Sequence, residues 1–275
     1  MDDRILVGTR KGTFLVTKEN GRWRPRLAGH AGGGVNFVAR DPTRGTLWAL
    51  LGHGHWGAKL ARSTDDGATW SDAPQVAYPE GARHYLPPPP SETGEGEGAP
   101  VLRPATLLKL WTLSFGQDGR MWIGTIPGGL FVSEDGGETF ELNRGLWDHE
   151  SPGGNQIDGD GNGTTKWYGT PADEGEVSPG LHSVVVDPRD ADRVLVAIST
   201  AGVFETTDGG TTWRARNEGL IMDYAPSPTD EWAGHDPLAI ELCPSDPDRV
   251  WQQNHCGVFV SDDGAATWKK VSKPE

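Results

Sequence analysis

The sequence predicts an all-β fold, a β-propeller of four-stranded antiparallel blades. One turn motif recurs along the chain, and short apolar segments separated by turn residues surround each copy. The motif reads hydroxyl, any residue, Asp, any residue, Gly, any residue, Thr, aromatic. Four copies occupy residues 63–70, 133–140, 206–213 and 261–268, and a weaker copy occupies 17–23. Repeats that run nearly end to end favour a single propeller.

Each position of the motif has a mechanical role. The aspartate can accept hydrogen bonds from backbone N–H groups of its own turn, and glycine supplies the positive φ that a tight reversal requires. The aromatic side chain returns to the apolar layer where the next strand begins. The motif therefore predicts a hairpin turn that is locked by its own side chains.

The apolar segments between the turns predict the strands. The clearest unit has an inner strand at 181–186, a second strand at 193–198 and a third at 202–206, which leads into the turn. Residues 237–268 repeat this order. Further inner strands are expected at 35–40 and 111–115, where the nearly continuous apolar character suits a strand covered on both faces.

We expect residues 1–275 to form one domain with five blade signatures, which end near Trp23, Trp70, Phe140, Trp213 and Trp268. A four-stranded blade needs roughly 40–50 residues. The two intervals from Trp70 to Phe140 and from Phe140 to Trp213 exceed this length, so loop insertions are expected at about 78–104 and 146–180. The first unit has no segment for an inner strand, and the last residues provide no closing strand. The propeller is therefore expected to be incomplete or truncated.

The turn motif resembles the Asp-box, or BNR, repeat of sialidase-like β-propellers. Cytoplasmic BNR-repeat proteins, described as exo-alpha-sialidase-like, are similar to this chain over nearly its whole length. The resemblance implies a propeller in which the Asp box is a fold element remote from the substrate. It also implies that ligands bind at the opposite face, which carries the loops that lead into the inner strands.

Composition excludes several classes of partner. The formal net charge is -14, which argues against nucleic acid or an anionic membrane as the main partner. No apolar run approaches membrane-spanning length, and the first residues lead into a strand without a signal-peptide pattern. Only two cysteines occur, Cys243 and Cys256. We therefore expect a cytoplasmic protein with free thiols.

Histidines concentrate in the loops expected at the ligand-binding face. They precede inner strands or connect second to third strands, where they approach the central channel. The functional interpretation is a polar ligand site, and the alternative is that each imidazole bonds to a carbonyl of its own loop. The candidate ligand-binding residues are His30, His53, His55, His182, His235 and His255.

The sialidase resemblance implies three arginines for a substrate carboxylate, a Tyr/Glu nucleophile pair and an aspartate acid/base, but no clear arginine triad is present. Tyr224 and Glu231 are candidates for a nucleophile pair. Propeller glycanases with Asp boxes use two aspartates, for which Asp148, Asp223 and Asp236 are candidates. The sequence leaves open whether the protein is an enzyme; if it is, a glycoside hydrolase-like reaction is expected.

A calcium site is a further candidate. Asp158, Asp160 and Asn162 alternate as in the first half of an EF-hand loop. The twelfth position is Gly169 instead of the bidentate glutamate, so the alternative is a polar, glycine-rich turn.

Two functions compete. The first is a propeller that binds a small polar or carbohydrate ligand at its histidine-rich face, with hydrolysis as an option. The second is a non-catalytic scaffold or assembly factor that docks a protein. A convergent group of polar side chains in one pocket favours the first, and a shallow face without convergent groups favours the second.

Overall fold

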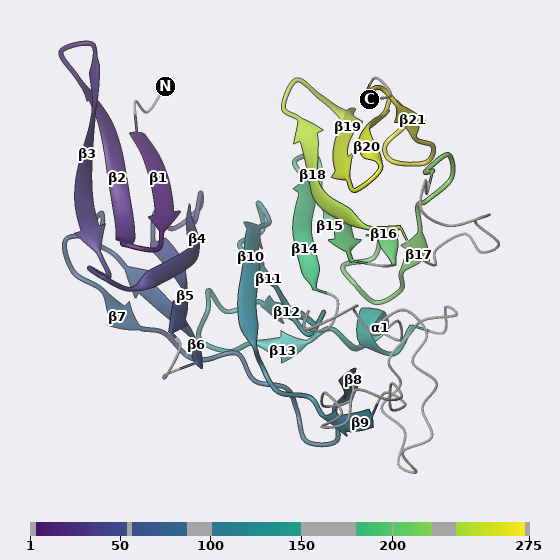
Figure 1. The fold of residues 1–275 in the computed structure, drawn as a ribbon, viewed down its shortest axis with the longest axis horizontal. Helices are drawn as coiled ribbons and strands as arrows, with labels where there is room; N and C mark the ends of the chain where they lie inside the picture. Colours follow the sequence, from purple (N-terminus) through teal and green to yellow (C-terminus); the bar gives the residue numbers. More distant parts are fainter. Residues whose placement is uncertain are drawn as a thin grey trace, which may run out of the picture.

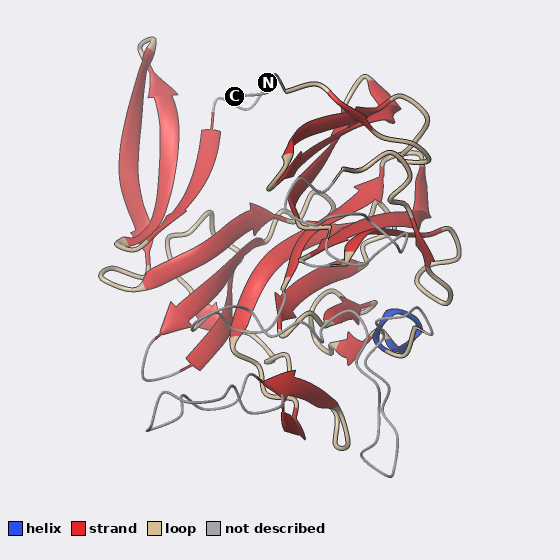
Figure 2. Ribbon diagram, turned by 45° about the vertical axis from the view of Figure 1, so that its right-hand side comes forward, coloured by secondary structure: helices blue, strands red, loops and turns tan. Residues whose placement is uncertain are grey.

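The structure, a computed structural model, describes residues 4–53, 57–86, 101–149, 180–199, 201–221 and 235–272. The described residues form five antiparallel blade sheets arranged in an open arc and a separate two-stranded sheet (Figure 1). The first sheet has three strands and the other four have four strands each. Strands make up nearly all of the regular structure (Figure 2). The fold is that of a β-propeller.

Each sheet is formed by strands that are consecutive in the sequence. The first sheet contains β1 (Arg4–Thr9), β2 (Gly12–Glu19) and β3 (Arg22–Gly29). The second contains β4 (Gly34–Arg40), β5 (Leu47–His53), β6 (Gly57–Ser63) and β7 (Ser71–Asp72). The third contains β10 (Lys109–Phe115), β11 (Met121–Ile126), β12 (Leu130–Ser133) and β13 (Glu141–Leu142).

The last two sheets follow the same order. The fourth contains β14 (Leu181–Asp187), β15 (Asp190–Ile198), β16 (Gly202–Thr206) and β17 (Arg214–Ala215). The fifth contains β18 (Pro237–Cys243), β19 (Asp246–Asn254), β20 (Gly257–Ser261) and β21 (Lys269–Lys270). The first predicted insertion contains a hairpin of β8 (Arg83–Leu86) and β9 (Val101–Pro104). The short helix α1 (Arg144–Trp147) begins just before the second predicted insertion and extends into it.

The predicted side-chain lock is present in all four complete turns. In the fourth sheet, Asp208 accepts hydrogen bonds from the backbone N–H of Thr212 at 2.9 Å and from its hydroxyl at 2.6 Å. Thr206 donates to Asp208 at 2.7 Å and accepts from the Gly210 N–H at 2.9 Å. These hydrogen bonds, led by those from Thr212, lower the pKa of Asp208 to about 2.

The other three turns repeat this geometry. The aspartates at positions 65, 135 and 263 each accept from the N–H and hydroxyl of the threonine four residues later. The last turn has Ala265 where the other three have glycine, and Ala265 adopts φ 68°. The turn conformation is therefore kept even where the side chain disfavours it.

The turn aromatics connect neighbouring sheets. The indole Nε1 of Trp70 donates to the carbonyl of Ala28 at 2.7 Å, and that of Trp268 donates to the carbonyl of Arg216 at 2.7 Å. Trp213 donates to Asn143 Oδ1 at 3.0 Å. In each case the acceptor lies at or just after the outer strand of the preceding sheet. The turn thus fastens its own sheet to the one before it.

The weak copy of the motif behaves differently. It forms the β2–β3 turn, where Asn20 and Gly21 have φ of 49° and 78°. The expectation that its aromatic returns to the apolar layer is wrong, because Trp23 is 49% exposed. This copy has no aspartate at the locking position, so the turn is made by local backbone conformation.

The apolar core lies between the sheets. Trp48, Trp122, Phe131 and Phe204 are almost fully buried in one cluster that joins the second, third and fourth sheets. A second cluster between the fourth and fifth sheets includes Phe259. At the ends of the arc, β1 is paired only with β2 among the described residues, and β21 pairs with β20. This agrees with the expectation that residues 269–270 do not pair with β1.

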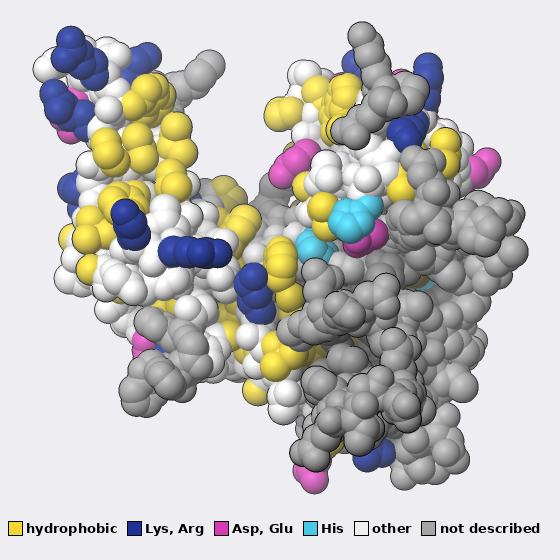
Figure 3. Space-filling view, in the orientation of Figure 1, with side chains coloured by type: hydrophobic (Ala, Val, Ile, Leu, Met, Phe, Trp, Pro, Cys, Tyr) yellow, Lys and Arg dark blue, Asp and Glu magenta, His cyan; other side chains and the backbone are white. Residues whose placement is uncertain are grey.

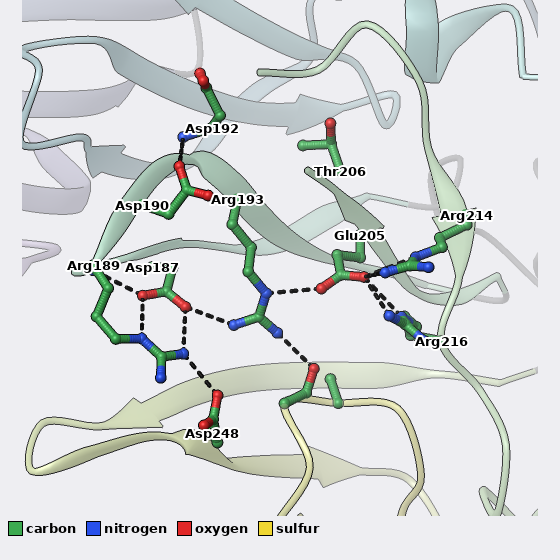
Figure 4. Close-up of polar contacts among 12 residues, drawn as sticks. Asp187, Arg189, Asp190, Asp192, Arg193, Glu205, Thr206, Arg214, Arg216 and Asp248 are labelled. Carbon is green, nitrogen blue, oxygen red and sulfur yellow. Dashed lines mark hydrogen bonds and ion pairs between the residues drawn. The ribbon is translucent and has the colours of Figure 1, made fainter. Parts of the chain in front are cut away.

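A buried ionic network also joins the fourth and fifth sheets (Figure 4). Glu205, which is 2% exposed, accepts hydrogen bonds from Arg193, Arg214 and Arg216. Arg193 also binds Asp187 and donates to the carbonyl of Gly264 in the last turn at 2.6 Å. Burial alone would raise the pKa of Glu205, but the hydrogen bonds from the three arginines hold it below its ordinary value.

We predict that Asp208→Ala destabilises the fold in a pH-dependent way. The Asp208 pKa is about 2 in the folded protein and about 3.9 when unfolded, so its stabilisation is present above about pH 4 and is lost as the pH falls toward 2. At pH 7 the variant should melt roughly 3–10 °C lower than the wild type. The difference should shrink in melts recorded near pH 2.5. Asp262→Ala, which removes an exposed ion pair with Arg249, is the control and should change the melting temperature little.

We predict that Glu205→Gln costs about 3–5 kcal/mol in urea unfolding, because it leaves buried arginines without their carboxylate. Arg214→Gln is the matched control. Arg214 is 59% exposed, and its loss leaves Glu205 with two other arginines. It should cost about 1 kcal/mol or less. Equal losses for the two variants would contradict a role for the buried carboxylate as the centre of the network.

Candidate ligand-binding site

The four inner strands β4, β10, β14 and β18 line a cavity of about 440 Å³ on the axis of the arc. Two hydrogen bonds connect these strands across sheet boundaries. Asn36 Nδ2 donates to the carbonyl of Leu110 at 3.3 Å, and the N–H of Ile240 donates to Ser183 Oγ at 3.2 Å. The walls of the cavity are therefore held together by polar contacts as well as by apolar packing.

Each inner strand carries an irregularity in register close to its first residues. The residues left out of the pairing are Asn36, Trp111, His182 and Leu238. A bulge of this kind turns a side chain away from the alternating pattern of a regular strand. All four residues line the cavity. The same backbone device thus brings one side chain from each of four sheets to the axis.

Trp111 is the aromatic centre of the site. The Lys109 ammonium lies 3.7 Å from the centre of its ring, a cation–π contact. The His182 ring is tilted by 55° against the indole, with 4.7 Å between the centroids. Trp111 and His182 belong to the third and fourth sheets, so this contact is made only when the two sheets pack together.

His182 is held by a residue at the end of the second strand of its sheet. Its Nε2 forms a hydrogen bond with the hydroxyl of Ser199, which follows β15 directly. Burial lowers the pKa of His182. Asp236 opposes this shift, whereas Lys109 and His255 reinforce it. The charges of three side chains therefore act on this one imidazole.

The fifth sheet completes the group. Asp236 precedes β18, and its Oδ2 lies 3.5 Å from His255 Nδ1 in the turn after β19. The carboxylate side chain is 18% exposed and the His255 side chain is 61% exposed. In Figure 3 histidine side chains meet an acidic side chain beside β14 and β18. We call this group the mouth cluster; it consists of Trp111 and His182, which line the cavity, and of Lys109, Ser199, Asp236 and His255, which contact them or act on them electrostatically.

Two buried polar atoms at this position lack a hydrogen-bond partner among the described residues. They are Asp236 Oδ1 and His235 Nδ1. His235 is 3% exposed, and burial lowers its pKa. Glu241, on β18, also lines the cavity; its side chain is exposed, and partial desolvation raises its pKa.

The structure brings together some of the predicted residues and separates others. His182, His235, His255 and Asp236 lie at the start of β14 and around β18 and β19. His30 lies between the first two sheets, where Nδ1 bonds to the Thr13 hydroxyl at 2.9 Å and the ring packs on Trp70. These partners differ from those of the mouth cluster.

Other predicted residues fall elsewhere or outside the described chain. His53 is the last residue of β5, and its side chain is outside the described part. Asp148 caps α1 and forms an ion pair with Arg144. The remaining candidates lie outside the described residues: His55, Asp158, Asp160, Asn162, Asp223, Tyr224 and Glu231. Within the described ranges, no group of three or more His, Cys, Asp or Glu side chains is arranged to hold a metal ion.

Lys109, Trp111 and Ser199 were missed by sequence reasoning. Trp111 was assigned only to an inner strand, and nothing in its local sequence marks the bulge that turns it to the axis. A signal was available in the alignment of the inner strands, because Trp111 and His182 occupy corresponding positions. Cys243 and Cys256 are both free, as expected. No helix in the described part of the chain has the length and apolar character needed to cross a membrane.

Solved structures with similar folds include enzymes of the GH74 class. The GH74 xyloglucanase from Xanthomonas campestris matches with a TM-score of 0.55 and 14% identity, over 97% of this chain and 37% of its own. The GH74 enzyme from Niastella koreensis matches with a TM-score of 0.52 and 16% identity, over 98% and 43% of the two chains. At these identities the likeness shows the β-propeller fold alone.

A local sequence similarity points in the same direction. Over 98 residues, 34% of this chain, the sequence is 29% identical to an oligoxyloglucan-reducing end-specific xyloglucanase from Emericella nidulans. The match spans 12% of that enzyme, and this chain covers less than half of each GH74 structure above. No protein-family model matches the chain.

Proposed function

We propose that this protein is an Asp-box propeller of the sialidase-like kind that binds a saccharide at the mouth cluster. The observation that carries the proposal is the convergence of Trp111 with Lys109, His182, Asp236 and His255 from three sheets. Sugars present apolar C–H faces and hydroxyl groups together. An aromatic ring surrounded by hydrogen-bonding side chains suits both.

The unpartnered atoms support a ligand with hydroxyl groups. Asp236 Oδ1 is a buried acceptor without a donor among the described residues. A buried polar atom of this kind is costly unless it forms a hydrogen bond. A sugar hydroxyl at the mouth supplies the missing donor. The local similarity to a xyloglucanase supports the same class of ligand.

Binding is better supported than hydrolysis. Glycosidases place two carboxyl groups about 5–5.5 Å or about 6.5–9.5 Å apart. Asp236 and Glu241 are separated by five residues along β18, roughly 15 Å at the rise of a strand. The described residues therefore offer one carboxylate, Asp236, at the mouth.

The convergence of polar groups in one place also favours a small ligand over the alternative, a protein-docking scaffold. The free thiols of Cys243 and Cys256 fit a reducing, cytoplasmic setting.

We predict that the wild-type protein binds a saccharide in calorimetric titrations with a panel of xyloglucan oligosaccharides, other neutral oligosaccharides and substituted monosaccharides. Asp236→Asn should weaken binding by about 10–100-fold, because the hydrogen bond from the sugar hydroxyl then goes to a neutral oxygen instead of a charged one. The melting temperature of this variant should stay close to that of the wild type. Asp72→Asn is the matched control, since Asp72 is 73% exposed and lies on an outer strand.

A second pair of variants tests the aromatic centre. Trp111→Ala should remove binding, whereas Trp251→Ala, which removes an indole that is 44% exposed on β19, should leave it unchanged. The proposal is wrong if no saccharide of the panel binds at millimolar concentration. It is also wrong if a saccharide binds but neither Asp236→Asn nor Trp111→Ala weakens the binding.

A further inference from the structure

We infer that the saccharide bound at the mouth cluster carries a phosphate group, which is held by Lys109. This inference rests on the proposed function and names the class of ligand. Lys109 is half-buried, and its ammonium lies against the ring of Trp111 at the start of β10. Its position next to the aromatic ring means that a sugar packed at this ring brings its substituents within reach of the ammonium.

The charge of Lys109 has no acidic counterpart among the described residues. Two other cations that are largely buried are paired. Arg120 binds Asp118 and Asp192, and Arg193 binds Asp187 and Glu205. No described carboxylate lies within ion-pair distance of Lys109. Lys109 is thus a cation without an ion-pair partner in a chain of net charge -14.

An unpaired, half-buried ammonium is unfavourable by itself. Burial lowers the pKa of Lys109, which shows that its charged form has lost solvation. The cation–π contact with Trp111 offsets part of this loss of solvation. An anionic group of the ligand that binds the ammonium directly compensates for more of the lost solvation, because charge-assisted hydrogen bonds are among the stronger polar contacts.

The charge of the ligand anion favours phosphate over carboxylate at this lysine. Lysine binds anions as a point charge, so the attraction grows with the charge of the anion, and a phosphate monoester carries about -1.5 to -2 at pH 7, more than a carboxylate. The mouth cluster contains a lysine and two imidazoles and has no arginine. Lys109 is the first residue of β10, and Asp236 directly precedes β18. The phosphate is therefore oriented toward β10, and the hydroxyl groups toward Asp236.

The experiment compares hexose 1- and 6-phosphates with glucose and with glucuronate. Binding is measured by calorimetry and, independently, by the broadening of the ³¹P resonance of the sugar phosphate. The wild type should bind at least one hexose phosphate about 10-fold or more tightly than glucose. Glucuronate, which carries a carboxylate of lower charge, should bind more weakly than that phosphate. Inorganic phosphate alone is a separate arm that shows how much the sugar contributes.

Three variants identify the role of Lys109. Lys109→Met keeps the length of the side chain over Trp111 and removes the charge, so it should abolish the preference for the phosphate. Lys109→Arg keeps the charge and should retain most of the preference for the phosphate. Lys59→Met is the control, because Lys59 is a paired lysine on β6, 3.6 Å from Asp72. Melting temperatures show that the variants are folded, and Lys109→Gln replaces Lys109→Met if the latter is not.

The outcomes separate this inference from the proposed function. If neutral saccharides bind and Lys109→Met changes nothing, the phosphate inference is overturned and the proposed function stands. Equal affinity for glucuronate and the hexose phosphates also overturns it. If no hexose phosphate binds at millimolar concentration, the inference fails whatever else binds. If neither neutral nor charged saccharides bind, both fail.

Discussion

The hydrogen bond from the tryptophan of an aspartate turn to the sheet before it, present at three of the four complete turns, is the interaction on which the rest of the structure depends. Within the turn, one carboxylate holds the N–H and the hydroxyl of a threonine four residues later. Three of the four turn aromatics carry an indole N–H, and each donates it to the neighbouring sheet. A local turn therefore becomes a fastening between sheets, which otherwise have only side-chain packing and a few polar contacts in common.

This fastening sets the arrangement of the inner strands. Each sheet is positioned against the previous one, so β4, β10, β14 and β18 follow one another around the axis (Figure 1). The ionic network around Glu205 and Arg193 strengthens the last of these junctions and binds the carbonyl of Gly264 within the final turn (Figure 4). The turns and the network lie away from the mouth cluster. Stability and ligand binding are thus separated in space, which allows either to be altered alone.

The mouth cluster depends on a second repeated device, the bulge near the start of each inner strand. It presents an asparagine, a tryptophan, a histidine and a leucine at equivalent positions of four sheets. The backbone is repeated, but the side chains are not. Function in a shared fold resides in such substitutions at fixed positions, and the likeness to GH74 enzymes therefore describes the frame in which this site is built.

The sequence by itself determined the features that neighbouring residues create. The turns were predictable because Asp208, Gly210 and Thr212 interact within one short segment, and the strands because apolar residues are grouped between the turns. The positions of His182, His255 and Asp236 at one face followed from the order of strands. Only the tertiary structure decided that Trp111 and Lys109 join them and that His30 does not. The bulge at Trp111 and the packing of His30 on Trp70 arise from contacts between sheets, between residues far apart in the chain, and no local pattern encodes such contacts.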